Sequence, residues 1–278
     1  MTRKGARRMS EIPPAILRAL NEGREETRTL VEWLAIDPGT LLRHVLKDIG
    51  LGREAARLGL AFGPHRGAGV SHRTRVVGRI LHEGLPAERR RAAFRGLSAH
   101  PSDMARAWAA YMVGADERLP LGKRLALARP FAADPHMAVR ECAWDSFRPH
   151  LARDLPKGLR LLRPWVRHRD PNVRRCAVEA TRPRGVWTEH LQPLKDDPEP
   201  GRPLLEPLRS DPSDYVRRSV ANWLNDASKS RPAWVRAVCR RWKKESRTPE
   251  TLWIVRRALR TVGPRGPLAS TSAAAGSP

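Results

Sequence analysis

Residues 170–181 read DPNVRRCAVEAT, and this stretch predicts an amphipathic helix. Asp170 suits the N-cap, and Pro171 suits the first helical position, where a missing N–H costs nothing. Four apolar side chains then recur at i, i+3, i+4 and i+7 on one face: Val173, Cys176, Ala177 and Ala180. A face of this kind must be buried, so the stretch predicts one helix of a packed helical unit.

Proline-led units of the same type recur along the chain. They read HPSDMARAWAAYM (100–112), DPHMAVRECAW (134–144), DPNVRRCAVEAT (170–181), DPSDYVRRSVANWL (211–224) and TPETLWIVRRAL (248–259). Their prolines are 34, 36, 41 and 37 residues apart, and further helical stretches lie between them. This spacing is typical of two-helix HEAT or armadillo repeats. We therefore expect an all-α, right-handed α-solenoid of HEAT-like repeats with a concave basic groove lined by the second helices.

The regular pattern predicts three segments. Residues 1–14 form a basic flexible arm, residues 15–262 form the repeat domain, and residues 263–278 form a disordered low-complexity tail. Within the repeat domain, residues 60–73 are expected to form a loop.

The charge balance points to a polyanionic partner. The chain has 53 Lys and Arg against 29 Asp and Glu, a net charge of +24. Aligning the repeats places arginines in register on one helix face, next to a second position that is also mostly arginine, and such a ladder suits a duplex backbone: Arg140, Arg174, Arg217 and Arg256. Because inter-repeat braces use the same residue type, we expect roughly half of these arginines to be structural.

Two carboxylates are the candidate chemical groups. The register aligns Asp145, Glu179 and Asn222, of which Glu179 is the stronger candidate because Arg175 lies at i−4 and Arg182 at i+3. In the fourth unit Arg218, Asn222, Asn225 and Asp226 share one face, opposite Val216, Val220 and Leu224. For Asp226 the alternative is a structural brace, for example to Lys229.

The aromatic residues and cysteines are mostly assigned to the core. We expect Trp108, Trp165 and Trp253 to be buried, whereas Trp187, just after the RPRG turn, is the best candidate for a ligand contact. The three cysteines fall near apolar helical positions without metal-ligand spacing, which indicates reduced core thiols in a cytoplasmic protein. The sequence shows no metal or cofactor motif. No apolar run approaches the roughly 18 residues of a membrane span.

Two long motifs carry a resemblance to a known family. RRCAVEATRPRGVW (174–187) and YVRRSVANWLNDASKSRP (215–232) resemble the paired signature of AlkC-type DNA alkylation repair glycosylases of the HEAT-like repeat superfamily. GREETRTLVEWLAID (23–37) resembles the opening segment of that family.

The resemblance implies a monofunctional glycosylase that excises cationic alkylated bases, such as 3-methyladenine and 3-methylcytosine, from duplex DNA. It places the catalytic group on Glu179, Arg175, Trp187 and Asp226. Other members carry a glutamate in the preceding repeat, where Trp144 stands here with Glu141 and Asp145 close by.

The chemistry agrees with this assignment. A cationic base is already a good leaving group, so the enzyme needs chiefly to stabilise the sugar cation. A carboxylate such as Glu179 or Asp226 near C1′ does so and can orient or deprotonate the attacking water. Arg175 positions the carboxylate, and the rings of Trp187 and Trp144 attract the cationic base.

The remaining predicted contacts are with DNA. They involve Arg140, Asp145, Trp144, Arg174, Arg182, Arg184, Arg217, Arg218, Asn222, Asn225, Lys229 and Arg257. We expect a cytoplasmic, nucleoid-associated bacterial monomer that acts on alkylated double-stranded DNA without a cofactor, a metal or a membrane.

Two alternatives remain open at this point. A catalytically silent solenoid that binds distorted or branched DNA would share the arginines but would be indifferent to loss of Glu179 or Asp226. A protein-interaction scaffold is the third hypothesis, and weak salt dependence of DNA affinity would favour it.

Overall fold

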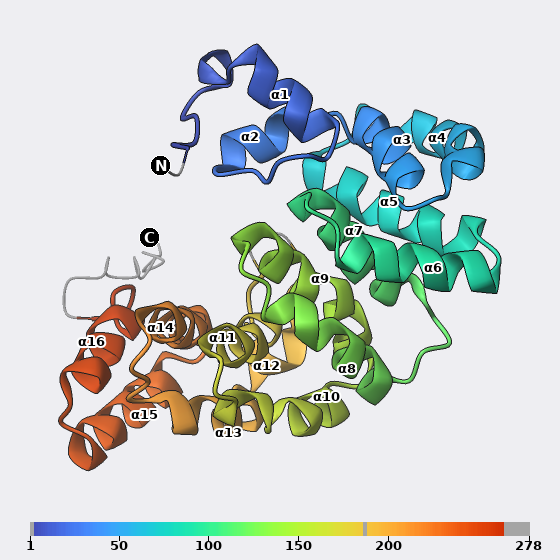
Figure 1. The fold of residues 1–278 in the computed structure, drawn as a ribbon. Helices are drawn as coiled ribbons and strands as arrows, with labels where there is room; N and C mark the ends of the chain where they lie inside the picture. Colours follow the sequence, from blue (N-terminus) through green and yellow to red (C-terminus); the bar gives the residue numbers. More distant parts are fainter. Residues whose placement is uncertain (1–2, 186–187, 264–278) are drawn as a thin grey trace, which may run out of the picture. The chain divides into compact units, whose positions relative to one another are not determined.

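The computed structural model of the chain describes residues 3–185 and 188–263, and these residues contain helices and loops but no strand (Figure 1). The chain divides into two compact units, residues 1–180 and 181–278, where the sequence predicts one continuous repeat domain over 15–262.

The first unit is a two-layer array of helices. Its helices are α1 (Pro14–Asn21), α2 (Leu30–Ala35), α3 (Pro38–Asp48), α4 (Ala55–Phe62), α5 (Val70–Gly84), α6 (Ala87–Ser98), α7 (Asp103–Ala115), α8 (Leu121–Ala132), α9 (Met137–Arg153), α10 (Leu155–Leu162) and α11 (Pro171–Ala180). From α5 onward, alternate helices pack on one another in the order α5, α7, α9 and α11, while α6 and α8 cover α7 and α9. Trp108 and Phe147 are fully buried within this array. The alternation is that of stacked helix pairs.

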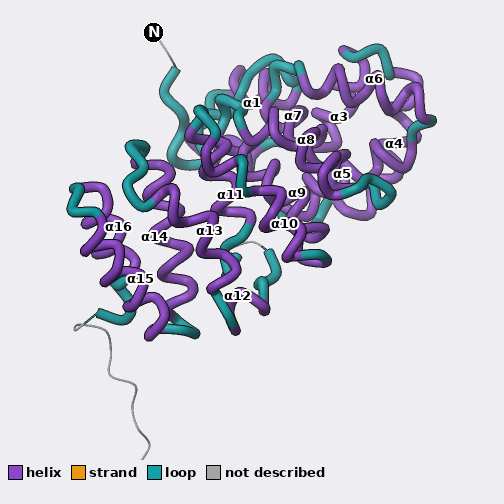
Figure 2. The backbone as a smooth tube through the Cα atoms, turned by 90° about the horizontal axis from the view of Figure 1, so that it is seen from below, coloured by secondary structure: helices purple, strands orange, loops and turns teal. Residues whose placement is uncertain are grey.

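The second unit repeats this arrangement on a smaller scale. Its helices are α12 (Gln192–Asp196), α13 (Arg202–Leu205), α14 (Asp214–Ser228), α15 (Pro232–Glu245) and α16 (Pro249–Ala258). Helix α14 packs against both α15 and α16, and Figure 2 shows these three helices side by side. Trp223 and Trp242 are fully buried here.

A recurrent turn begins four of the proline-led units. In the copy at Asp134, the Asp134 carboxylate accepts a hydrogen bond from the N–H of His136 at 2.7 Å. Arg140 Nη1 then donates to the carbonyl oxygens of Asp134 and Pro135, both at 2.7 Å. A charged donor thus satisfies two carbonyls that no helix bonds.

The other copies keep the same spacing of i, i+2 and i+6. Equivalent side-chain donors to the carbonyls at i and i+1 are Arg106, Arg174 and Arg217. The first residues of these turns are His100, His168 and Asp211. We call the motif the arginine-capped turn. It explains why arginine recurs in register in the absence of any ligand.

The N-terminal segment is packed, whereas the sequence predicts a flexible arm. Arg3 binds the Glu32 carboxylate through two nitrogens, at 2.6 and 2.9 Å. The backbone N–H groups of Ala6 and Arg28 donate to the same carboxylate at 2.9 and 2.7 Å. These bonds, led by that of Arg3, lower the pKa of Glu32 to about 2 despite its burial. A single fully buried carboxylate therefore holds residues 3–6 against α2.

Several smaller expectations can be compared with the structure. The expected loop at 60–73 is partly helical, since α4 ends at Phe62 and α5 begins at Val70. Trp108 and Trp165 are buried as predicted, but Trp253 is only half-buried, with the guanidinium groups of Arg217 and Arg257 6.0 and 5.6 Å from its ring centroid. Tail residues 264–278 lie outside the described residues.

All three cysteines are free and buried, as expected: Cys142, Cys176 and Cys239. Burial raises their pKa above the ordinary thiol value, to about 12 for Cys239. In the part of the chain that the structure describes, no helix is both long and apolar enough to cross a membrane.

Candidate functional site

Helix α11 forms as the sequence predicts. It begins at Pro171, and the Asp170 carboxylate caps it by accepting the N–H of Asn172 at 2.8 Å. The predicted apolar face is buried, with exposed fractions of 2 % or less: Val173, Cys176, Ala177 and Ala180. That burial fixes the rotation of α11 and therefore the direction in which Arg175 and Glu179 project.

Arg175 lies between two carboxylates. Its Nη1 is 2.6 Å from Glu141 Oε1 on α9, and its Nη2 is 3.7 Å from Glu179 Oε1 on its own helix. Trp144 on α9 donates its indole N–H to Glu141 Oε2 at 3.0 Å. We call Glu141, Trp144, Arg175 and Glu179 the α9–α11 cluster. The side chains of Arg175 and Glu179 are 12 % and 7 % exposed, so their charges interact in a partly dehydrated environment.

Asp145 belongs to a neighbouring buried network. Arg75 on α5 binds its carboxylate through Nε at 2.8 Å and Nη2 at 3.0 Å, and the Tyr111 hydroxyl on α7 donates to it at 2.6 Å. These contacts raise the pKa of Arg75, while burial raises the pKa of Tyr111 well above its usual value. Asp145 thus joins three successive helices of one layer, and the sequence analysis did not identify Arg75 or Tyr111.

Asp226 is the corresponding carboxylate of the second unit. Arg182 binds Oδ2 through both Nε and Nη2 at 2.8 Å, and Lys229 Nζ is 3.6 Å from Oδ1. Arg184 donates to the Asp226 carbonyl oxygen at 3.3 Å and to Ser230 Oγ at 2.7 Å. The carboxylate is 4 % exposed. Three predicted site cations therefore surround one predicted catalytic carboxylate, including the brace to Lys229 that the sequence suggested as an alternative.

Three of the arginines predicted to contact DNA have a structural role. Arg140, Arg174 and Arg217 belong to arginine-capped turns, where Nη1 is bonded to main-chain carbonyls. Asn225 is 2 % exposed and donates its amide N–H groups to the Ala258 carbonyl and to Thr261 Oγ1. It holds α14 to α16 instead of facing solvent.

The other predicted DNA contacts in the second unit are more accessible. The Arg218 side chain is 63 % exposed and pairs with Asp214 at 2.7 Å, an ion pair that is weak on a surface. Asn222 accepts a hydrogen bond from Arg260 at 3.1 Å, and Arg257 lies over the Trp253 ring. Trp187, predicted to touch the ligand, lies outside the described residues.

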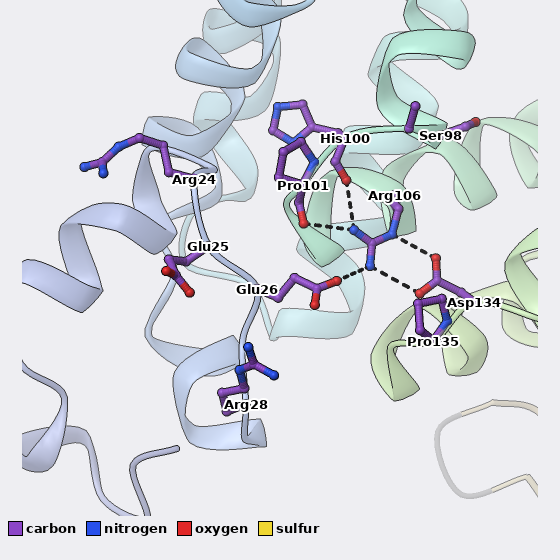
Figure 3. Close-up of a pocket in the computed structure, with 11 residues that line it drawn as sticks. Arg24, Glu25, Glu26, Arg28, Ser98, His100, Pro101, Arg106, Asp134 and Pro135 are labelled. Carbon is purple, nitrogen blue, oxygen red and sulfur yellow. Dashed lines mark hydrogen bonds and ion pairs between the residues drawn. The ribbon is translucent and has the colours of Figure 1, made fainter. Parts of the chain in front are cut away.

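A pocket of about 560 Å³ occurs elsewhere in the first unit (Figure 3). Arg106 forms part of its wall and binds Glu26, Asp134 and the carbonyl oxygens of His100 and Pro101. All three nitrogens of this guanidinium are engaged, so Arg106 braces the wall. Among the described residues, no group of three or more His, Cys, Asp or Glu could hold a metal ion.

Comparison with known proteins places this geometry in context. Residues 133–261, which contain α9, α11 and α14, match the DNA alkylation repair enzyme family. Among curated proteins, the uncharacterized protein YhaZ of Bacillus subtilis is 45 % identical over 84 residues, which are 30 % of this chain and 23 % of that protein.

Two solved structures share the fold. The Pseudomonas fluorescens alkylpurine DNA glycosylase AlkC, solved bound to DNA containing an abasic site analogue, is 27 % identical, with a TM-score of 0.66 over 79 % of this chain and 61 % of that one. AlkD2 from Streptococcus mutans is 22 % identical, with a TM-score of 0.59 over 79 % of this chain and 99 % of that one.

These comparisons confirm the all-α, HEAT-like repeat class and the resemblance to AlkC-type alkylation repair proteins. The chain spans less than two thirds of AlkC and about a quarter of YhaZ.

Proposed function

Residues 133–261 of this chain carry the sequence of the DNA alkylation repair enzyme family, and on that premise we propose that the protein is a DNA glycosylase. Its substrates are cationic alkylated bases in duplex DNA, of the 3-methyladenine and 3-methylcytosine type. It hydrolyses the N-glycosidic bond without further cleavage of the strand, and needs no metal or cofactor for this step.

The single observation that carries the proposal is the environment of Glu179. This carboxylate is 6 % exposed and lies beside Arg175 on a helix of the matched segment. As the C1′–N bond breaks, its electron pair neutralises the cationic base, and positive charge develops on the sugar. A fixed carboxylate in a poorly hydrated site stabilises that charge. Water then forms the C1′–O bond and gives its proton to the carboxylate or to solvent.

The other predicted catalytic residues have supporting roles in this proposal. Arg175 fixes the orientation of Glu179 through their ion pair. Asp226 supplies the second unit's carboxylate, oriented by Arg182 through two nitrogens. Trp187 attracts the cationic base through its ring face.

Binding to the DNA backbone rests on the excess of positive charge. The net charge of +24 predicts strong, salt-dependent association. We assign the phosphate contacts to accessible cations such as Arg218, Arg257 and Lys229, whereas the arginine-capped turns maintain the scaffold. The protein acts as a monomer on chromosomal DNA in the bacterial cytoplasm.

The competing function is a silent DNA-binding protein. It is favoured by one observation, namely that Glu179 and Asp226 both have arginine partners, as structural braces do.

Release of free bases from methylated duplex DNA separates the two functions. We expect 3-methyl bases to be released, and the logarithm of DNA affinity to fall steeply with the logarithm of salt concentration, by about 0.9 per neutralised phosphate. Tight, salt-sensitive binding without any released base would establish the silent protein. Weak binding with little salt dependence would favour a protein-interaction scaffold.

A further inference from the structure

Glu141 is held at both of its carboxylate oxygens, although the sequence gives it no role of its own. Oε1 lies 2.6 Å from Arg175 Nη1, and Oε2 accepts the indole N–H of Trp144 at 3.0 Å. Trp144 is 4 % exposed, so its ring is fixed by packing. A carboxylate held by a rigid donor and by an arginine from the next helix of the layer has a defined position and orientation.

The distances show how Arg175 divides its charge. Its shorter ion pair is with Glu141 at 2.6 Å, and the pair with Glu179 is 3.7 Å long. The formal charges of Glu141, Arg175 and Glu179 sum to −1. Without the charge of Glu141, the sum would be zero, and Arg175 would compensate Glu179 alone. Coulomb attraction between a cation and this group therefore depends on Glu141.

We propose that Glu141 is a positioning residue that makes the α9–α11 cluster selective for positive charge. It binds Arg175 so that the guanidinium orients Glu179 without cancelling the cluster's negative charge, and Trp144 fixes Glu141 for this task. The inference rests on the proposed function and adds to it the origin of the preference for a cationic substrate.

A purely structural ion pair between α9 and α11 would explain the same distances. Such a brace would contribute to stability but would not distinguish a cationic ligand from a neutral one. The test must therefore compare two ligands of similar shape and different charge, at equal protein stability.

The probes are two duplexes of one sequence that contain abasic analogues. One analogue is a pyrrolidine, whose ring amine is protonated, and the other is a neutral tetrahydrofuran. The measured quantity is the ratio of the two dissociation constants, neutral over cationic, at one salt concentration. Phosphate contacts are common to both duplexes and cancel in this ratio.

The variants separate charge from shape. Glu141→Gln keeps an acceptor for the Trp144 indole but removes the charge, and Glu141→Asp keeps the charge. Trp144→Phe keeps the buried ring but removes the N–H donor. The control is Glu117→Gln, because the exposed Glu117 pairs with Arg153 at the same 2.6 Å outside the cluster.

We expect the unmodified protein to prefer the cationic duplex and Glu141→Gln to lower the ratio about tenfold. Glu141→Asp should retain most of the preference, Trp144→Phe should lose part of it, and Glu117→Gln should keep it. Thermal unfolding of each variant shows whether the protein is folded.

The negative outcomes are distinguishable. If the unmodified protein prefers the cationic duplex and Glu141→Gln keeps the same ratio, the role of Glu141 is overturned while the proposed function stands. If the unmodified protein binds both duplexes equally and releases no methylated base, the proposed function and this inference both fail.

Discussion

Glu179 in the first unit and Asp226 in the second are both buried carboxylates paired with arginine, yet their charged neighbours differ. Glu179 shares Arg175 with a second carboxylate, so anions outnumber cations in the α9–α11 cluster. Asp226 is bound by Arg182 and approached by Lys229, so cations outnumber anions there. The comparison suggests that Glu179 is placed to stabilise developing positive charge, whereas Asp226 is largely compensated.

The largest effect expected from this difference is on catalysis by Glu179. Glu179→Gln should reduce the rate of base release roughly 100- to 1,000-fold, the range typical of losing one preorganised electrostatic group. Asp226→Asn should cause a smaller reduction, because its charge is already compensated. Single-turnover release from methylated duplex, at protein concentrations that saturate DNA binding, measures both variants. Equal losses would contradict the distinction between the two carboxylates.

A second effect concerns the stability of the second unit. Arg182→Gln removes two hydrogen bonds to Asp226 and leaves a 4 % exposed carboxylate with Lys229 at 3.6 Å. We expect a loss of about 3 kcal/mol in the free energy of unfolding. Urea denaturation followed by circular dichroism gives this value. The double variant with Asp226→Asn should recover part of the loss, and no recovery would mean that the charge of Asp226 is not the cause.

A third prediction compares capping arginines with surface arginines. Arg140→Leu should cost about 1 to 2 kcal/mol of stability, because two turn carbonyls lose their donor. Arg218→Leu should cost less than about 1 kcal/mol, because its ion pair is exposed. The order should reverse for DNA: only Arg218→Leu should lower affinity and reduce the log–log salt slope by about 0.9. A reduced slope for Arg140→Leu would show that this residue also contacts phosphate.

The smallest expected effect is a pH dependence at the N-terminus. The folded-state pKa of Glu32, about 2, lies below its ordinary value of 4.5. Its contribution to stability is therefore present above about pH 4.5 and is lost as the pH falls through about 2. Glu32→Gln lacks this contribution at neutral pH, so the stability difference between the two proteins should shrink on acidification. A difference that does not change with pH would show that the Arg3 pair is not electrostatic in origin.

The sequence predicts the features that depend on short-range spacing. Helical periodicity gives the buried face of α11 and the pairing of Arg175 with Glu179 four residues later. The spacing of the prolines gives the repeats. These predictions succeed because i, i+3 and i+4 positions meet in any α-helix.

Contacts between distant segments could not be predicted in the same way. Arg75 is 70 residues from Asp145, and Glu141 is 34 residues from Arg175, so only the packing of successive helices brings them together. The packed N-terminus has the same cause, because Arg3 and Glu32 are 29 residues apart.

One structural signal was present in the sequence. A His or Asp followed six residues later by Arg marks each arginine-capped turn, including the copy that begins at His168 instead of Asp170. Recognition of this spacing would have assigned Arg140, Arg174 and Arg217 to the scaffold.

The central claim is that this protein breaks the glycosidic bond of cationic bases by means of Glu179. The most direct measurement is the chromatographic quantification of free 3-methyladenine and free adenine released from one methylated duplex by the unmodified protein. The account predicts release of 3-methyladenine alone, and its loss in Glu179→Gln at equal DNA occupancy. Release of neither base, or of both at similar rates, would contradict it.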